Sequence, residues 1–401
     1  MRSSITIVGA SLSGIRAAET LRAEGFKGKI KLFGEEERTP YDRPPLSKNF
    51  LDGEMPFERL SLISEEKILE LEIELALGSK ATNLDVESQT LEIEGIKESF
   101  DGLIIATGAR ARKLPNSDKI QGVHTLRSVD DSIRIREAFK SGKSKVVIVG
   151  AGFIGCEVAS TASNLGLEVT VLETQHVPLC HVLGEKVGTI ISDLHTTNGV
   201  ELNCGVKVQE IQGGDHVEGV LLTDGTLIEA DLVIVGIGAV PNTEWLENSG
   251  LTIDDGVCCD ETCLAAPNIV AAGDVARWYH VGYGKSIRLE HWDNAAEQGK
   301  YSAQRLLHDE ANNPPYAPVP WFWSDQFDRK IQLAGISSPE DEFEVVVDSP
   351  QEGRFTGIYG NEGKLRAVIG INRPRHVMQF KSLIEKGSSW KEALEFASGI
   401  E

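Results

Sequence analysis

The hydrophobic pattern of the chain predicts two copies of one strand–helix–strand unit. An apolar run at residues 5–8 leads through a glycine turn into an amphipathic helix and a strand at 30–33. A second apolar run at 146–149 leads through another glycine turn into a helix and a strand at 169–172. Continuous apolar runs are typical of buried parallel strands, so we expect an α/β fold with one nucleotide site in each unit.

The rest of the pattern predicts more buried strands and a C-terminal module. Further apolar runs that end in glycine turns lie at residues 103–105, 232–235 and 268–272. The Asn-Asn-Pro-Pro stretch at 312–315 indicates a linker. After it the chain becomes strand-rich and ends in helical patterns: strands at 343–347 and 365–369, helices at 377–386 and 390–396.

The charge balance excludes two classes of partner. With 40 Lys and Arg against 61 Asp and Glu, the formal net charge is −21. A phosphate backbone needs a cationic face, so we expect no nucleic-acid binding. The same negative charge opposes docking on anionic membranes.

Apolar run length and cysteine number predict the compartment. The longest apolar run, near 232–240, is interrupted by glycines and is too short to cross about 30 Å of hydrocarbon. The first residues run directly into a strand pattern, so we expect no signal peptide. Six cysteines in 401 residues are too few for a secreted disulfide scaffold, and we expect a cytoplasmic protein.

The two glycine turns have the residues that a pyrophosphate-binding loop needs. The first glycine makes the turn, the second lets the backbone approach the phosphates, and the third lets the helix pack on the strand. The helix N-terminus adds free N–H groups and a partial positive charge. The later loop has all three glycines, whereas the earlier loop has a serine at the second position: Gly150, Gly152 and Gly155, against Gly9, Ser11 and Gly14.

An acid follows the second strand of each unit, Glu35 in the first and Glu173 in the second. A carboxylate at this place accepts hydrogen bonds from a ribose 2′-hydroxyl and repels a 2′-phosphate. The later unit is therefore predicted to prefer NADH to NADPH. The alternative for Glu173 is a solvated acid at a strand end.

Further motifs resemble those of the two-dinucleotide-fold flavoprotein reductases. They are Ala106-Thr107-Gly108, the turn at 236–242 and Gly273-Asp274. Within that superfamily, three more segments resemble the NADH:ferredoxin reductases of bacterial cytochrome P450 and aromatic-ring dioxygenase systems: PYDRPPLSK at 40–48, EHWDNA at 290–295 and PWFWSDQ at 320–326. The likeness covers nearly the whole chain. Ser11 departs from the usual glycine, from which we expect a slightly altered approach to the FAD pyrophosphate.

The resemblance implies a fold and a reaction. The fold is α/β, with two Rossmann-like dinucleotide-binding domains as in glutathione reductase, and an α+β C-terminal domain. Residues 1–111 and 237–313 would form a discontinuous FAD-binding domain, residues 112–236 the NAD-binding domain and residues 314–401 the C-terminal domain. The enzyme would be a ferredoxin–NAD(+) reductase. It would take hydride from NADH and pass single electrons through FAD to a [2Fe-2S] ferredoxin that feeds a P450 or Rieske oxygenase.

The resemblance also implies the site residues. For FAD they are Gly9, Ser13, Gly14, Glu35, Arg43, Lys48, Ala81, Arg127, Asp274, Trp292 and Trp323. For NAD they are Gly150, Gly152, Ile154, Gly155, Glu173 and Gly238.

Two of the implied residues would be catalytic. Lys48 would lie near the reactive nitrogen of the flavin, and Glu157 would lie near the nicotinamide, able to pair with Lys48. A cation beside the flavin favours the negative charge that hydride transfer creates. The alternatives are a surface lysine and a solvated acid in the first turn of a helix.

The cysteines and histidines indicate no other redox or metal chemistry. Disulfide reductases of this superfamily carry a C-x4-C pair, and peroxidase relatives one cysteine, in the stretch that corresponds to residues 41–50; here it holds none. Cys258, Cys259 and Cys263 have no second pair and no histidine at ligand spacing, so we expect packing thiols and no metal site. Electrons would then leave the flavin directly for a partner.

Two alternatives to a ferredoxin reductase stay open. The first is a rubredoxin reductase or a cysteine-free NADH oxidase, which differs in the acceptor that is reduced quickly. The second is a redox-responsive interaction protein similar to apoptosis-inducing factor. Such a protein would reduce ferredoxin poorly and keep a long-lived complex with NAD+.

A basic segment is the candidate docking site for the ferredoxin. Ferredoxins of this kind are usually acidic, so a chain of charge −21 needs a local basic patch for a productive encounter. Residues 363–384 hold five basic side chains and no Asp or Glu: Lys364, Arg366, Arg373, Arg375 and Lys381. Arg329 and Lys330 could extend this patch. The alternative is that these side chains pair with acids elsewhere. We expect a monomer or weak dimer.

Overall fold

The computed structural model describes residues 2–115, 117–142, 144–308 and 313–400. The chain divides into two compact units, each built from three segments. Unit 1 consists of Met1–Asp42, Phe57–Arg110 and Ala239–Pro318; unit 2 consists of Arg43–Pro56, Ala111–Gly238 and Val319–Glu401. The finer division into three domains stays a prediction. The linker expected at 312–315 begins outside the described residues, at Asn312.

A six-stranded sheet forms the centre of unit 1, in the order β19-β20-β7-β1-β2-β3. Its strands are β1 (Ser4–Val8), β2 (Lys29–Phe33), β3 (Ile73–Ala76), β7 (Gly102–Ile105), β19 (Leu264–Ala266) and β20 (Ile269–Ala271). Neighbouring strands are parallel except for β19 with β20. Strand β7 is buried along its whole length, as its continuous apolar run predicts.

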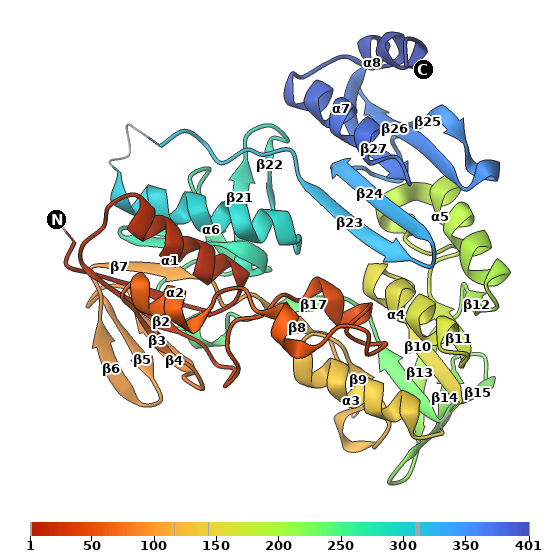
Figure 1. Ribbon diagram of the computed structural model, residues 1–401, viewed down its shortest axis with the longest axis horizontal. Coiled ribbons are helices and arrows are strands. Elements are labelled where there is room, and N and C mark those ends of the chain that lie inside the picture. The colour runs from red at the N-terminus through yellow and green to blue at the C-terminus, as the bar shows by residue number, and fades with distance from the viewer. Residues whose placement is uncertain (1, 116, 143, 309–312, 401) are drawn as a thin grey trace. The chain divides into compact units, whose positions relative to one another are not determined.

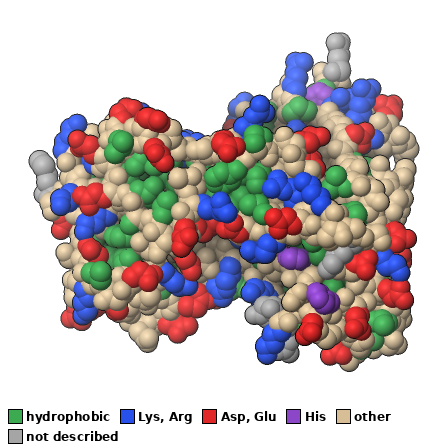
Figure 2. All heavy atoms as spheres, turned by 60° about the horizontal axis from the view of Figure 1, so that its bottom comes forward, with side chains coloured by type: hydrophobic (Ala, Val, Ile, Leu, Met, Phe, Trp, Pro, Cys, Tyr) green, Lys and Arg blue, Asp and Glu red, His purple; other side chains and the backbone are tan. Residues whose placement is uncertain are grey.

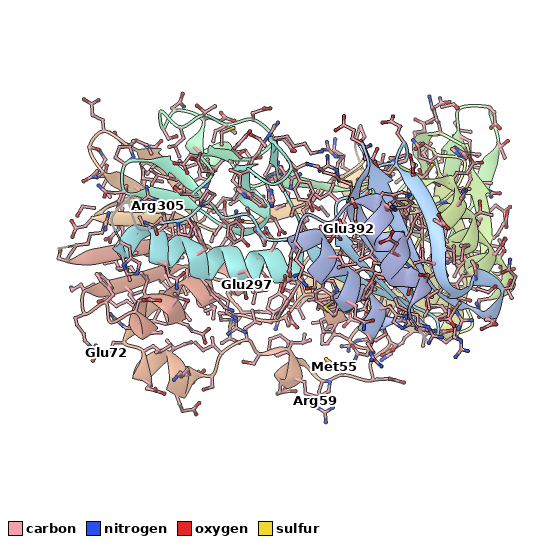
Figure 3. The ribbon with its side chains drawn as sticks, turned by 90° about the horizontal axis from the view of Figure 1, so that it is seen from above. Met55, Arg59, Glu72, Glu297, Arg305 and Glu392 are labelled. Carbon is pink, nitrogen blue, oxygen red and sulfur yellow. The ribbon has the colours of Figure 1, made fainter. Side chains whose placement is uncertain are left out.

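Helices α1 (Leu12–Ala23) and α6 (Trp292–Leu307) lie side by side in unit 1 (Figure 1). Glycine makes this close packing possible, because a Cβ on Gly299 of α6 would lie 2.4 Å from the carbonyl oxygen of Ser13. Ala303 and Leu306 of α6 share a core with Ile15 and Leu21 of α1. The polar side chains Glu297 and Arg305 also belong to α6 (Figure 3). The last helix of unit 1 in sequence is thus tied to the first.

Smaller elements complete unit 1. They are the antiparallel sheet of β4 (Ala81–Asp85), β5 (Thr90–Ile93) and β6 (Ile96–Ser99), the sheet of β18 (Val257–Cys259), β21 (Ala276–His280) and β22 (Lys285–Ile287), and helix α2 (Glu65–Glu70). Strands β8 (Ala109–Ala111) and β17 (Ala239–Pro241) pair near the points where the chain passes between the units.

Unit 2 contains a five-stranded parallel sheet in the order β12-β11-β10-β16-β9. Its strands are β9 (Val123–Thr125), β10 (Lys145–Val149), β11 (Glu168–Glu173), β12 (Glu201–Cys204) and β16 (Leu232–Val235). The helices that follow strands are α3 (Val129–Lys140), α4 (Phe153–Asn164) and α5 (Cys180–Thr197). A small antiparallel sheet is formed by β13 (Val208–Gly213), β14 (Val217–Leu222) and β15 (Leu227–Glu229).

The C-terminal part of unit 2 is an antiparallel sheet in the order β23-β24-β27-β26-β25, with two helices. Its elements are β23 (Trp321–Gln326), β24 (Arg329–Gly335), β25 (Glu342–Ser349), β26 (Arg354–Asn361), β27 (Lys364–Ile371), α7 (Pro374–Glu385) and α8 (Trp390–Ser398). Glu392, seen on α8 in Figure 3, closes a capping box with Ser389. One core joins the five-stranded parallel sheet and helix α4 to the C-terminal sheet, through Ile148, Val158, Phe355 and Ile369.

The predicted fold class is confirmed: both strand–helix–strand units are present, and the C-terminal part mixes strands with helices. Within the described residues, no helix is both long enough and apolar enough to cross a membrane.

Candidate functional site

The first glycine loop, between β1 and α1, is closed by contacts that only glycine permits. Gly9 has φ +120°, and a Cβ on it would lie 2.0 Å from the carbonyl oxygen of Ala106. A Cβ on Gly14 would lie 1.9 Å from the carbonyl oxygen of Gly9. Both glycines therefore set the loop by sterics. Ser11 is the N-cap residue of α1, but its side chain makes no capping hydrogen bond, so it does not occupy the free N–H groups of the helix.

A second segment of unit 1 meets this loop. A Cβ on Gly273 would lie 3.2 Å from the Cβ of Ser13, so the Gly273-Asp274 turn and the start of α1 are neighbours. The turn is held by Gln298 of α6, whose Oε1 accepts a hydrogen bond from Gly273 N at 2.9 Å. Asp274 is 9% exposed.

The loop fits an anionic group. The Ser13 hydroxyl is buried and has no hydrogen-bond partner among the described residues. A buried donor without a partner is unfavourable unless a ligand satisfies it. It lies in the first turn of α1, where free N–H groups favour anions. These residues therefore fit the pyrophosphate of a dinucleotide.

The other FAD candidates of unit 1 lie in three places. Glu35 follows β2 and is 61% exposed, with its Oε1 accepting from Lys80 Nζ at 2.6 Å. Ala81 is buried at the start of β4. Trp292, the first residue of α6, donates its indole N–H to Asp42 Oδ1 at 2.6 Å.

His291 precedes Trp292 as the N-cap residue of α6. Burial lowers its pKa to about 4, and the nearby charge of Asp274 opposes this only in part. The imidazole is therefore neutral near pH 7. It can hydrogen-bond near the candidate flavin residues of unit 1 without adding a positive charge there.

Besides Lys48, three further FAD candidates belong to unit 2: Arg43, Arg127 and Trp323. Arg43 donates through Nη1 to the carbonyl oxygen of Arg127 at 2.7 Å, so these two lie together. Trp323 of β23 stacks on Trp321, with ring centroids 5.5 Å apart.

The second glycine loop, between β10 and α4, separates two roles of glycine. Gly150 has φ +102°, and a Cβ on it would lie 2.4 Å from the carbonyl oxygen of Gly236. A Cβ on Gly155 would lie 2.0 Å from the carbonyl oxygen of Gly150. A Cβ on Gly152 would meet no protein atom within 4 Å. The space beside Gly152 is therefore open to a ligand. Nearby Ile154 is 46% exposed, which is unusual for a large apolar residue at a helix start.

Glu173 ends β11 and reaches back to the glycine loop. Its Oε2 accepts a hydrogen bond from Ala151 N at 2.7 Å, and its Oε1 accepts from Gln175 N at 2.9 Å. A carboxylate oxygen has two lone pairs, so Oε2 keeps one for a ribose hydroxyl. Gly238, at the end of the unit's central segment, has φ +95° and open space at its Cβ position.

Lys48 and Glu157 form an ion pair inside unit 2, as the sequence allowed. Lys48 Nζ lies 2.8 Å from Glu157 Oε2, and their side chains are 18% and 3% exposed. Lys48 is the C-cap residue of the short helix η1 (Pro44–Ser47) and also donates to the carbonyl oxygen of Pro44. The structure thus excludes a solvated surface lysine and a solvated helix acid at these positions.

Sequence reasoning missed the hydroxyl groups around this pair. The Ser47 hydroxyl donates to Glu157 Oε2 at 2.5 Å, and the Ser324 hydroxyl donates to Glu157 Oε1 at 2.7 Å. Thr161, one turn along α4, donates to the carbonyl oxygen of Ser47. Ser47 and Ser324 both lie in segments that carried the family resemblance, and this was the only signal that could have found them.

The cysteines are all free. Cys263 is fully buried and its sulfur accepts a hydrogen bond from Gln298 Nε2 at 3.3 Å, while burial raises its pKa to about 12. Burial likewise raises the pKa of Cys259. Within the described ranges, no group of three or more His, Cys, Asp or Glu is placed to hold a metal.

Comparison with known proteins identifies the family. Residues 3–299 match the family described as Pyridine nucleotide-disulphide oxidoreductase, and residues 321–396 match the one described as Reductase C-terminal. The chain belongs to the pyridine nucleotide-disulphide oxidoreductases. Within this family its relatives include rhodocoxin reductase of Rhodococcus erythropolis, 37% identical over 386 residues that cover 95% of this chain and 89% of the relative.

Two other members of the family are similarly close. The benzene 1,2-dioxygenase system ferredoxin–NAD(+) reductase subunit of Pseudomonas putida is 35% identical over 96% of this chain and 93% of its own length. The crystal structure of the covalent putidaredoxin reductase–putidaredoxin complex contains a chain that is 33% identical to the present one and superimposes on it with a TM-score of 0.91. The match covers 96% of the present chain and 93% of that chain. The predicted resemblance to NADH:ferredoxin reductases is therefore confirmed.

Proposed function

We propose that this protein is an FAD-dependent ferredoxin–NAD(+) reductase that takes hydride from NADH and passes single electrons to a ferredoxin. Its cofactors are FAD and NADH. The proposal depends on one combination of features: each unit has a glycine loop, and all six cysteines of this protein are free. Two dinucleotides without a dithiol require electrons to leave by an external carrier.

FAD is assigned to unit 1. Gly9 and Gly14 close the loop, and Ser13 supplies a buried hydroxyl at the helix N-terminus for a phosphate oxygen. Asp274 stands beside this loop, on the turn that Gln298 holds. When bound, FAD accepts the two electrons of a hydride together and releases them singly.

The residues of unit 2 are assigned two roles: binding NADH and stabilising the negative charge that hydride transfer creates. Gly152 leaves room for a pyrophosphate, and Glu173 offers an acceptor to the ribose. Lys48 places an ammonium group where negative charge develops during hydride transfer, and Glu157 holds that ammonium group. Arg43 is assigned to FAD, and its guanidinium group is held by the carbonyl oxygen of Arg127.

The test of this function is NADH-dependent reduction of cytochrome c through a panel of purified ferredoxins. The purified protein should be yellow, and acid or heat should release its FAD. Rapid turnover with a [2Fe-2S] ferredoxin supports the proposal. Turnover only with rubredoxin, or only with dioxygen, would move the function to a rubredoxin reductase or an NADH oxidase. The cytoplasmic location of the protein and its oligomeric state, a monomer or weak dimer, stay predictions.

We expect Glu173→Gln to narrow the preference for NADH over NADPH, mainly through KM. The amide oxygen keeps an acceptor for Ala151 N, while the negative charge that repels a 2′-phosphate is lost. Charge repulsion of about 2 kcal/mol, reduced by solvent from about 4, corresponds to more than tenfold discrimination. Steady-state kinetics with both nucleotides measure the change.

Glu168→Gln is the matched control for this prediction, because Glu168 is an exposed acid at the other end of β11. It should leave the ratio of the two kcat/KM values unchanged. Equal use of NADH and NADPH by the wild-type protein would remove the role given to Glu173.

The proposed docking patch is partly neutralised inside unit 2. Arg373 forms an ion pair with Asp348, and Lys381 lies 2.6 Å from Glu385. Arg375 is exposed, and it and Arg366 form no ion pair among the described residues. On the face that Figure 2 shows, basic and acidic side chains are interspersed. Lys364 is exposed and likewise forms no ion pair among the described residues, so Lys364, Arg366 and Arg375 are the positions that support docking best.

We expect Arg375→Glu to lower kcat/KM for ferredoxin roughly three- to tenfold at low salt and to flatten its salt dependence. Reduction of ferricyanide, which needs no docking face, should change much less. Lys391→Glu on α8 is the control, because Lys391 is also an exposed cation but lies outside the basic segment. Arg373 is the poorer choice, since its reversal would bring two acids together at Asp348. An equal loss with both acceptors would count against docking at Arg375.

A further inference from the structure

A chain of hydrogen bonds runs away from Glu157 into the interior of unit 2. Ser324 Oγ lies 2.7 Å from Glu157 Oε1, and Gln326 Nε2 lies 3.1 Å from Ser324 Oγ. Gln326 Oε1 in turn lies 3.0 Å from His195 Nε2. All four side chains are at least nine-tenths buried, with Gln326 and Ser324 fully so. Of these four side chains, only Glu157 contacts Lys48 in the proposed reaction.

The direction of every bond in this chain is fixed. Gln326 Oε1 carries no proton, so His195 must donate through Nε2–H. That bond turns the amide N–H of Gln326 toward the oxygen of Ser324. The Ser324 oxygen therefore accepts from Gln326, and its one proton is left for Glu157. Each donor points toward the carboxylate.

The chain delivers no net charge to Glu157. Burial lowers the pKa of His195, and the hydrogen bond to Gln326 opposes this shift only in part. His195 is therefore neutral near pH 7, and it packs edge-on against Phe327. The negative charge of Glu157 is stabilised by neutral donors on the Oε1 side and remains available to the Lys48 ammonium on the Oε2 side.

We propose that Ser324, Gln326 and His195 are positioning residues that hold the Glu157 carboxylate, and through it the Lys48 ammonium, in place for hydride transfer. The inference rests on the proposed function of the Lys48–Glu157 pair. A buried carboxylate whose Oε1 lost its donor would rotate or draw in water, because an unsatisfied buried charge is costly. Lys48 would then lose the fixed partner that sets the place of its charge.

The first test is anaerobic stopped-flow reduction of the FAD-containing protein by saturating NADH. Ser324→Ala should lower the limiting rate constant roughly 5- to 20-fold, since a hydrogen bond to a buried charge is lost. The apparent Kd for NADH should change less than twofold. Ser324→Thr, which keeps the hydroxyl, should restore most of the rate. In the Lys48→Met background, Ser324→Ala should have little further effect, because the group it positions is gone.

Ser160→Ala is the matched control. Ser160 lies on α4, the helix of Glu157, and is also buried. Its oxygen accepts a hydrogen bond from Phe327 N at 2.6 Å, directly after β23, the strand of Ser324. Among the described residues its hydroxyl forms no hydrogen bond with Glu157, so its loss should affect thermal stability but not the rate of flavin reduction. If Ser324→Ala does not fold, Gln326→Met removes the same support one bond further away and should lower the rate in the same direction.

A second readout does not depend on activity. Labelling of Lys48 by acetic anhydride, followed by mass spectrometry, reports how firmly its ammonium is held. Ser324→Ala should label Lys48 several-fold faster than wild type, and Ser160→Ala should not. A wild-type protein that NADH does not reduce would overturn the proposed function itself. A normal wild type, with Ser324→Ala matching Ser160→Ala in both rate and labelling, would overturn the positioning role alone.

Discussion

Lys48→Met should lower the limiting rate constant for flavin reduction by NADH roughly 30- to 100-fold. The expected reason is that the negative charge that develops during hydride transfer would lose the preorganised ammonium group that stabilises it. Methionine keeps most of the side-chain volume, so the local packing should survive. The charge acts mainly as hydride arrives, so the apparent Kd for NADH should change little. Stopped-flow reduction at several NADH concentrations separates the two quantities.

Part of the effect of Lys48→Met could come from Glu157 rather than from the lost cation. Glu157 is 3% exposed, and without Lys48 the hydrogen-bond donors left to its carboxylate among the described residues are the hydroxyls of Ser47 and Ser324. The double variant Lys48→Met/Glu157→Gln removes this buried charge and isolates the missing cation. Lys140→Met, at an exposed lysine of α3, is the control for loss of one positive charge. An unchanged rate with full FAD content would deny Lys48 any catalytic role.

The parts of the fold that the sequence predicted are those with strong local patterns. Strand β10 combines a continuous apolar run with a glycine turn, and its bounds agree within one residue with the expected 146–149. The expected helix follows it as α4, which begins at Phe153. Helix α5 was not predicted, and it is interrupted at Gly184, which has φ 73°. The small antiparallel sheets were also missed, since short strands with mixed faces, such as β13, have no clear period.

The candidate site was predictable where its contacts are local to one strand–helix–strand unit. Glu173 and Ala151 are 22 residues apart, and their hydrogen bond follows from the unit itself. The Ser324–Glu157 and His195–Gln326 hydrogen bonds span 167 and 131 residues. No local pattern reports such pairings, because they depend on how the C-terminal sheet packs on α4 and α5. The ion pair of Arg373 with Asp348 was also missed, because it depends on the strand order β27-β26-β25 within the C-terminal sheet.

The glycine loops permit a sharper separation of folding from binding. Gly14→Ala should yield protein that retains no FAD, because its Cβ would lie 1.9 Å from the carbonyl oxygen of Gly9, and neither backbone can move away without opening the loop. Gly152→Ala should retain full FAD and an unchanged Tm, since its Cβ would meet no protein atom within 4 Å. Its methyl group would instead occupy space given to the NADH pyrophosphate, and KM for NADH should rise roughly tenfold or more.

The absorbance ratio of flavin to protein, thermal unfolding and NADH titration measure these outcomes together. Gly214→Ala is the control for Gly152→Ala, because its Cβ also meets nothing within 4 Å but lies outside both loops. It should change none of the three quantities. The earlier loop already carries a side chain at the equivalent of Gly152, namely Ser11, so room at that position is a matter of the ligand and not of the fold. Tight NADH binding by Gly152→Ala would mean that the pyrophosphate does not lie against this loop. FAD retained by Gly14→Ala would mean that the loop can open without losing its ligand.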